Sequence, residues 1–215
     1  MNQLVDYYAK RAPEYDRIYE KPERQGDLGR LRETVRETFR GRDVLEIACG
    51  TGYWTQDLAD VAKSITAVDI NKSVLEIARR RRGAERVRFE IADVYALPVL
   101  PRSSACLCGF WWSHMPKGRI EQFLAGLHKA LKPGATVMFM DNCYVEGNST
   151  PLSRKDAEGN TYQTRTLDDG STHEVLKNFP TEEELRRAVA GVAESASFRA
   201  LTYYWIFTYR LKGVD

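Results

Sequence analysis

Residues 44–55 read VLEIACGTGYWT, in which a short apolar run containing Glu46 leads directly into Gly50 and Gly52. A short apolar run that ends at glycines is typical of a buried strand followed by a turn. Because glycine has no side chain, a ligand can lie against the backbone of such a turn. With the helical pattern that continues to about residue 62, the segment predicts a strand–turn–helix unit with a ligand site at its turn.

Short apolar strands and amphipathic helices alternate from this unit to residue 141. The predicted strands lie at 44–48, 65–68, 87–91, 105–110 and 135–140, and two further helices at 71–82 and 118–131. Such alternation predicts parallel strands joined by right-handed crossovers. The expected fold class is therefore α/β: a Rossmann-like doubly wound sheet, mostly parallel with an antiparallel edge, with an N-terminal helical cap.

Individual residues mark where the helices begin and end. Asn71 is a suitable N-cap for the helix after the second strand, and the basic run Arg79–Arg82 at its end complements the helix dipole. Pro133-Gly134 is expected to terminate the helix before the fifth strand. Nearer the C-terminus, Thr181 and Glu184 have the spacing of a capping box.

The segments on either side of this core follow other patterns. Two helices are predicted before it, at about 3–18 and 28–39, and a polar stretch after it has alternation at 162–166 and 173–176 that predicts a hairpin. Residues 198–211 predict one long strand or two paired strands at a sheet edge. We expect a single domain over 1–215, made of a helical cap (1–40), a ligand-binding core (41–141), an irregular insertion with its hairpin (142–179) and a C-terminal helix and edge strand (180–215).

Composition excludes several classes of partner. Lys and Arg number 32 and Asp and Glu 30, so the net charge of +2 provides no strong attraction to nucleic acid or to an anionic membrane. No apolar run reaches the ~18 residues of a membrane span, and the N-terminus lacks the apolar core of a signal peptide. The four cysteines form no CxxC pair and predict reduced thiols, as in a cytoplasmic protein. The oligomeric state stays open.

Acidic residues follow successive predicted strands, at the edge where a doubly wound sheet binds its ligands. Asp69 comes nineteen positions after Gly50, a spacing that suits a carboxylate binding the two hydroxyls of a ribose, and Asp93 follows the third strand. Thr55 stands where a dinucleotide fingerprint needs its third glycine, which argues against a nicotinamide dehydrogenase. Glu46 favours a cationic ligand over a pyrophosphate, either by direct contact or as a structural acid that holds the turn.

Four segments in order resemble one known family. VLEIACGTGYWT at 44–55, AVDIN at 67–71, IADVYALP at 91–98 and LHKALKPGATVMFMD at 127–141 are similar to the class I S-adenosylmethionine-dependent methyltransferases. The small-molecule branch, which includes ubiquinone and menaquinone methyltransferases, is the most similar. The resemblance implies that S-adenosylmethionine is the cofactor and that the chain is an enzyme, which transfers a methyl group to a small molecule.

The resemblance also implies roles for residues at the strand ends. Gly50 and Gly52 would pass under the amino-acid part of the cofactor, Asp69 would bind the ribose hydroxyls, and Asp93 would accept from the adenine amine. The RAPEYD segment at 11–16 would place Tyr15 near the methionine part. The expected cofactor contacts are Tyr15, Glu46, Ala48, Gly50, Gly52, Trp54, Asp69, Ile70, Asp93, Val94 and Phe110.

The segment after the fourth strand, GFWWSHMP at 109–116, is expected to border the methyl group. His114 is the candidate general base, needed if the acceptor is a hydroxyl or an ammonium. Both tryptophans are candidates for the acceptor pocket, with packing inside the fold as the alternative. The expected acceptor contacts are Tyr7, Tyr8 and Arg11 of the cap, Trp111 and Trp112, and Arg165 and His173 of the insertion.

Motifs of other methyltransferase classes are missing from the sequence. No Asn/Asp-Pro-Pro-aromatic motif and no pair of glutamates follows the fourth strand. Asp141-Asn142 matches half of a magnesium site, but no acid follows the fourth strand to complete it, so no metal is expected. A small-molecule acceptor remains the leading hypothesis. A noncatalytic S-adenosylmethionine-binding module and a nucleic-acid or protein methyltransferase are the alternatives.

Overall fold

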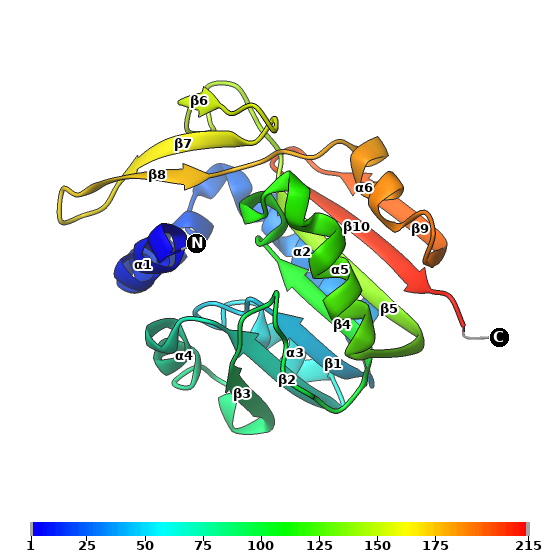
Figure 1. Ribbon diagram of the computed structural model, residues 1–215. Helices are drawn as coiled ribbons and strands as arrows, with labels where there is room; N and C mark the ends of the chain where they lie inside the picture. The colour runs from blue at the N-terminus through cyan, green and yellow to red at the C-terminus, as the bar shows by residue number, and fades with distance from the viewer. Residues whose placement is uncertain (1, 214–215) are drawn as a thin grey trace.

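The computed structural model describes residues 2–213 and contains a seven-stranded sheet with the strand order β3-β2-β1-β4-β5-β10-β9 (Figure 1). Its strands are β1 (Asp43–Ile47), β2 (Ser64–Asp69), β3 (Val87–Ile91), β4 (Ser103–Gly109), β5 (Leu131–Asn142), β9 (Ala193–Ala200) and β10 (Tyr204–Leu211). β1 to β5 are parallel, whereas β10 pairs antiparallel with β5 and with β9. The predicted α/β class with an antiparallel edge is confirmed.

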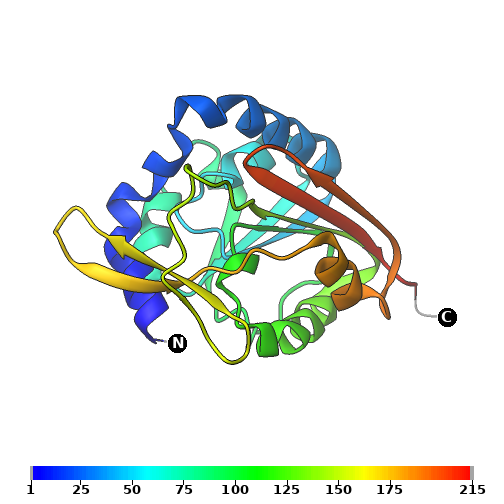
Figure 2. The same cartoon turned by 90° about the horizontal axis from the view of Figure 1, so that it is seen from above.

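Helices cover both faces of this sheet, as the view from above shows (Figure 2). They are α2 (Gln25–Phe39), α3 (Thr55–Val61) and α4 (Lys72–Ala78) on one face, and α5 (Ile120–Lys129) and α6 (Glu182–Val189) on the other. Short 3₁₀ helices connect several elements: η2 (Pro22–Arg24), η3 (Ala84–Arg86), η4 (Trp112–His114) and η5 (Lys117–Arg119). Each layer of helices buries its apolar side chains against the central strands, so two hydrophobic cores flank the sheet.

The N-terminal cap lies across the carboxyl ends of the parallel strands. It consists of α1 (Asn2–Arg11) and the 3₁₀ helix η1 (Ala12–Tyr19), so the single helix predicted over 3–18 is wrong. Pro13 has no backbone N–H to continue an α-helix beyond α1 and stands in the first turn of η1, where proline is tolerated.

The insertion forms a second, three-stranded sheet of β6 (Arg154–Lys155), β7 (Thr161–Thr166) and β8 (Thr172–Leu176). Antiparallel pairing of β7 with β8 confirms the predicted hairpin. The hairpin lies beside α1 in both views, where Tyr7 packs with Leu167 and Val175 (Figures 1 and 2). The insertion therefore holds the cap from the side away from the parallel strands.

Two predicted helix ends are wrong. α4 ends at Ala78, not at residue 82, because Arg80 and Arg81 donate to carbonyls only three residues earlier, and the chain then turns at Gly83 (φ +81°). Asn71 precedes α4 but does not cap it, since its side-chain amide donates to the Val5 carbonyl of the cap at 3.2 Å. α5 ends at Lys129 and β5 begins at Leu131, so Pro133-Gly134 lies within the strand.

Other predictions hold at the C-terminal end. Thr181 and Glu184 form the capping box of α6, and the last aromatic segment is the second of two paired strands.

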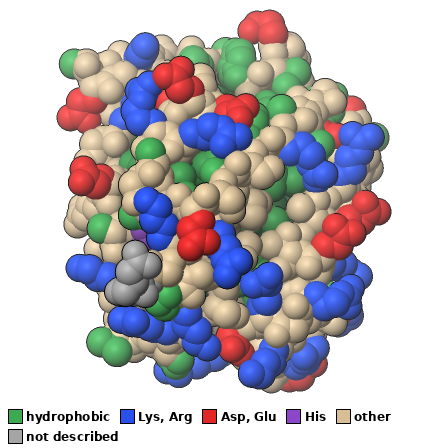
Figure 3. Space-filling view, turned by 90° about the vertical axis from the view of Figure 1, so that its right-hand side faces the viewer, with side chains coloured by type: hydrophobic (Ala, Val, Ile, Leu, Met, Phe, Trp, Pro, Cys, Tyr) green, Lys and Arg blue, Asp and Glu red, His purple; other side chains and the backbone are tan. Residues whose placement is uncertain are grey.

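All four cysteines are free. Within residues 2–213, no helix has the length and apolar character needed to cross a membrane. Lys and Arg side chains are interspersed with Asp and Glu on the face in Figure 3.

Candidate functional site

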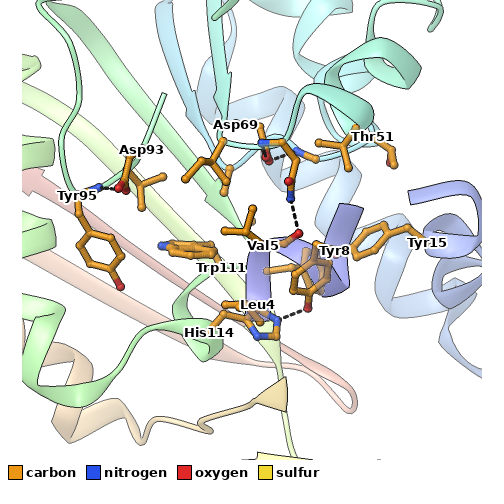
Figure 4. Close-up of a pocket in the computed structure, with 18 residues that line it drawn as sticks. Leu4, Val5, Tyr8, Tyr15, Thr51, Asp69, Asp93, Tyr95, Trp111 and His114 are labelled. Atoms are coloured by element: carbon orange, nitrogen blue, oxygen red, sulfur yellow. Dashed lines mark hydrogen bonds between the residues drawn. The ribbon is translucent and has the colours of Figure 1, made fainter. Parts of the chain in front are cut away.

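A cavity with about 830 Å³ of empty space lies at the carboxyl ends of β1, β2 and β4, beneath α1 (Figure 4). Its lining comes from the segments after these strands, from 93–95 beyond β3, and from the cap. Parallel strands present their carboxyl ends at one edge, which is why residues far apart in sequence meet here. This first cavity is the candidate cofactor site.

Unusual backbone conformations shape the floor of the first cavity. Gly50 has φ +55°, as its place in the turn requires, and Ala48 and Phe110 also have positive values, +51° and +59°. Positive φ is uncommon for residues with a side chain, and such positions concentrate at ligand sites. Ala48 and Phe110 follow β1 and β4 directly, and all three residues line the cavity. The backbone is therefore bent where both central strands end.

Asp69 connects the glycine turn to the end of β2. Its carboxylate accepts from the backbone N–H of Gly50 and from that of Asn71, both at 2.9 Å. The side chain is buried and lines the cavity, where its carboxylate has further lone pairs to offer. Burial raises the pKa of Asp69, although the two backbone donors act in the opposite direction.

Residues that follow β3 and β4 form the far end of the cavity. Asp93 accepts from the Tyr95 backbone N–H at 2.9 Å, and Ile70 and Val94 lie on the same lining (Figure 4). Within residues 2–213, the Tyr95 hydroxyl and the Trp111 indole N–H are buried without a hydrogen-bond partner. Both residues line the cavity with other parts of their side chains, because these two atoms have almost no accessible surface.

The cap closes the first cavity on the side facing solvent. Leu4 and Val5 of α1 point into it, as do Tyr8 and Tyr15 (Figure 4). A network anchors the cap to the glycine turn: Thr51 donates to Asp16 at 2.6 Å, and Arg81 binds both Asp16 and the Thr51 carbonyl. One member of the basic run 79–82 thus links the cap to the turn.

Tyr8 and His114 form a hydrogen-bonded pair on the wall of the cavity. His114 Nδ1 lies 2.7 Å from the Leu176 carbonyl, which can only accept, so Nδ1 carries the proton and Nε2 accepts from the Tyr8 hydroxyl at 2.7 Å. Burial, with the Lys177 ammonium nearby, holds the pKa of His114 well below its ordinary value. His114 is therefore neutral, and its free lone pair is already engaged by Tyr8.

Most of the predicted cofactor contacts line this cavity, but three do not. Glu46 is buried behind the turn, where it accepts from the Thr55 hydroxyl at 2.7 Å, and burial raises its pKa to about 8. Trp54 is buried against Phe110 and donates to the Tyr19 hydroxyl. Gly52 permits close packing on α4, because a Cβ there would come within 2.9 Å of the Ala78 Cβ. These residues build the site without lining it.

The predicted acceptor contacts divide in a similar way. A second cavity adjoins the first, and Tyr7, Arg11 and Arg165 line it. Trp111 lines the first cavity, and Tyr8 lines both. Trp112, predicted as an acceptor contact, lines neither cavity: its side chain is only 3% exposed and packs against Phe139 and Trp205 in the core. His173, also predicted as an acceptor contact, lies outside both linings. It is beside Tyr7 and forms a hydrogen bond with the Ser171 hydroxyl.

The sequence interpretation missed several lining residues. Leu4, Val5, Thr51, Asn71, Val74, Tyr95 and Gly109 also face the first cavity. A signal existed for Thr51 and Asn71, which adjoin the glycine turn and the second strand end. The sequence predicted a helical cap over the site, but not that Leu4 and Val5 are on the face of α1 that lines the cavity. The Asp141 carboxylate, which matched half of a magnesium site in the sequence, is instead paired within the protein: it binds Lys177 at 3.0 Å and accepts from the Ser113 backbone N–H.

A family model described as a methyltransferase domain matches residues 44–134. The malonyl-[acyl-carrier protein] O-methyltransferase of Serratia marcescens is 28% identical over 54% of this chain and 44% of its own length. The ubiquinone biosynthesis O-methyltransferase of Thiobacillus denitrificans is 25% identical over 79% of this chain and 72% of its own length. This chain spans about half the length of most of the curated relatives it matches.

Among solved structures, a DhpI–SAH complex superimposes with a TM-score of 0.81 at 29% identity, covering 98% of this chain and 96% of that one. A DhpI–SAM–HEP complex superimposes with a TM-score of 0.80 at 28% identity, covering 98% and 99%. The strand order, the bent glycine turn and the cavity beneath the cap agree with these similarities. Together these similarities support a class I S-adenosylmethionine-dependent methyltransferase fold for this chain, with the methyltransferase domain matched over residues 44–134.

Proposed function

We propose that this chain binds S-adenosylmethionine in the first cavity and transfers its methyl group to a small organic acceptor in the second. One observation carries the proposal: the cavity at the strand ends adjoins the second through a common wall of Tyr8, Tyr15, Phe110 and His114. A cofactor and an acceptor in these cavities would meet at that wall. Relatives named malonyl-[acyl-carrier protein] O-methyltransferase and ubiquinone biosynthesis O-methyltransferase support transfer to an organic acceptor group.

The residues present fit this cofactor. Its ribose needs hydrogen-bond acceptors, and Asp69 offers buried carboxylate lone pairs at a strand end. Its adenine needs apolar walls and polar partners, which Ile70, Val94 and the carboxylate of Asp93 supply.

When bound, S-adenosylmethionine supplies a methyl group on a positively charged sulfur, ready for in-line displacement. The protein's contribution is alignment and exclusion of water, and alignment alone can lower a barrier by ~7–11 kcal/mol. Leu4 and Val5 cover the cavity from α1, and the network from Arg81 through Asp16 to the Thr51 carbonyl holds the cap in place. The tyrosines on the common wall restrict how an acceptor can approach.

His114 is proposed to take a proton only indirectly. Because its Nε2 accepts from Tyr8, a proton from an acceptor hydroxyl or ammonium would move to the Tyr8 oxygen while the Tyr8 proton moves to Nε2. Replacing Tyr8 by Phe interrupts this path and leaves the ring in place. We expect Tyr8→Phe to lower kcat for an acceptor that must lose a proton and to leave cofactor affinity nearly unchanged.

Calorimetric titration with S-adenosylmethionine, and separately with NAD, tests the cofactor assignment. Micromolar affinity for the first and no heat from the second is the expected result, and preference for NAD would overturn the proposal. Formation of S-adenosylhomocysteine with any acceptor then separates an enzyme from a noncatalytic binding module.

We also propose, from the free thiols and the balanced charge, a single domain that works in the cytoplasm without binding nucleic acid or a membrane.

A further inference from the structure

The second cavity has an unusual charge balance. It has about 1,440 Å³ of empty space between the cap, the hairpin β7–β8 and the segment after β5. Six basic side chains line it, together with only two acidic ones, Glu14 and Asp168. The basic ones are Arg11, Arg17, Lys21, Arg24, Arg165 and Lys177. For the whole chain, by contrast, basic and acidic residues nearly balance, so this positive charge is local.

Internal ion pairs neutralise only part of this charge. Lys177 binds Asp141 at 3.0 Å, and Arg17 binds Asp168 at 2.5 Å at the rim. Within residues 2–213, Arg11 and Arg165 have no carboxylate within ion-pair distance. Arg165 donates to the neutral Gln163 amide oxygen at 2.8 Å, and Arg11 lies over the Tyr15 ring at 5.0 Å. Arg11 and Arg165 are thus left without a counter-ion in the described part of the chain, as is Arg24, which donates to the neutral Asn148 amide oxygen.

The Arg11 and Arg165 guanidinium groups are partly removed from water. Arg11 at the end of α1 and Arg165 on β7 are half-buried, and they face the cavity from opposite elements. Partial burial of unpaired like charges is unfavourable, and a cation–π contact such as that of Arg11 recovers only ~0.5–2 kcal/mol. An anion between them would satisfy donors that the protein leaves unpaired.

The pKa values of neighbouring groups reflect the same local positive charge. Burial is the main cause that lowers the pKa of Lys177 to about 8, and the charges of Arg165 and Arg11 contribute to that decrease. Arg165 also acts to lower the pKa of His114. An environment that opposes further positive charge on these groups favours a negatively charged ligand. Lys177 and His114 both line the cavity, so the field extends to the wall shared with the cofactor site.

We propose that the methyl acceptor is an organic oxyanion, a carboxylate, phosphonate or phosphate monoester, whose charged group binds between Arg11 and Arg165. Guanidinium groups offer paired N–H donors that match the oxygens of such anions. The inference rests on the proposed function and identifies the class of its acceptor. Tyr8 and His114, next to these arginines on the common wall, then contact the part of the acceptor that approaches the cofactor.

Calorimetric titration of the protein saturated with S-adenosylhomocysteine tests this proposal, because the first cavity is then filled. The probes are methylphosphonate and butyrate, with their uncharged counterparts dimethyl methylphosphonate and butyramide. We expect at least one anion to bind and neither neutral compound to do so. Tighter binding of methylphosphonate would identify a phosphonate or phosphate ester acceptor, and tighter binding of butyrate a carboxylate.

Variants locate the binding. Arg165→Gln and Arg11→Gln should each weaken anion binding at least tenfold, with Arg165→Lys intermediate. Arg154→Gln is the matched control, since Arg154 lies in the same small sheet but is exposed and paired with Glu174. Thermal melting checks that each variant folds. Anion binding that is absent, or that is the same in all variants, would overturn the inference.

Repeating the titrations without S-adenosylhomocysteine keeps the two proposals separate. If S-adenosylhomocysteine does not bind, the proposed function fails, yet anion binding that depends on Arg165 would still support an oxyanion site in the second cavity. If S-adenosylhomocysteine binds and neither anion does, the cofactor assignment stands and the acceptor class is wrong.

Discussion

The two adjoining cavities differ in how they are built. The first is formed mainly by short segments that follow parallel strands, so its residues come from predictable points in the sequence. The second is formed by α1, the hairpin β7–β8 and the stretch after β5, which meet only through tertiary packing. The first offers a carboxylate at a strand end, and the second offers unpaired guanidinium groups. The comparison separates a cofactor site typical of the fold from an acceptor site particular to this chain.

The adjacent residues Trp111 and Trp112 provide the largest expected contrast. Trp112 is buried in the core beneath α5, so Trp112→Ala should lower the free energy of unfolding by ~3–5 kcal/mol. Trp111 is half-buried on the lining of the first cavity, so Trp111→Ala should cost much less stability and weaken ligand binding instead. Urea denaturation and calorimetric titration measure the two effects. Equal destabilisation by both changes would mean that Trp111 is also a core residue.

Asp69 tests whether the first cavity is the cofactor site. Asp69→Ala removes a buried carboxylate from the lining, and hydrogen bonds to a charged group contribute ~1.5–3 kcal/mol, so S-adenosylmethionine should bind about tenfold more weakly or worse. Asp57→Asn is the matched control, because Asp57 is equally buried but pairs with Arg36 on the far side of the turn. Titration of both variants checks this, and a similar loss of affinity in the control would point to general destabilisation.

His114, on the wall between the two cavities, should make the free energy of unfolding decrease in acid. Its folded-state pKa lies below the unfolded value of ~6.5, so the unfolded chain binds more protons below that pH. The contribution of His114 to stability is fully present above pH ~6.5 and decreases as the pH falls toward the folded-state pKa, by up to ~1.4 kcal/mol per pH unit. His114→Asn should flatten this dependence in urea denaturation between pH 7 and 5. A slope unchanged by the substitution would assign it to other groups.

Arg81 and Arg82 provide the smallest contrast. Arg81→Gln loosens the link between the glycine turn and the cap, and an exposed or half-buried ion pair contributes ~0.2–1 kcal/mol, so cofactor affinity should fall about two- to fivefold. Arg82 pairs with Asp60 at the surface, away from both cavities, so Arg82→Gln should bind the cofactor as the unmodified protein does. Calorimetry compares the two variants. A larger loss for Arg82→Gln would show that the basic run acts through the helix end.

The same contrast explains which cavity-lining residues could be located from the sequence. Gly50, Asp69 and Asp93 were identifiable because strand ends meet at one edge of any doubly wound sheet. The roles of Trp54 and Trp112 could not be read in this way, because an indole beside a site looks identical in sequence whether it faces the cavity or the core. Glu46 was left open between ligand contact and a structural role, and only the position of the Thr55 hydroxyl decided for the latter.

Local patterns in the sequence determined the order of strands and helices, the glycine turn and the acids at the strand ends, because apolar periodicity and turn residues act over a few neighbouring positions. Tertiary structure decided the rest: that Asn71 binds the cap instead of starting its helix, and that Tyr8 donates to His114 across the wall. These contacts join residues separated by 66 to more than 100 positions, and their geometry follows from how whole elements pack, which no local pattern encodes.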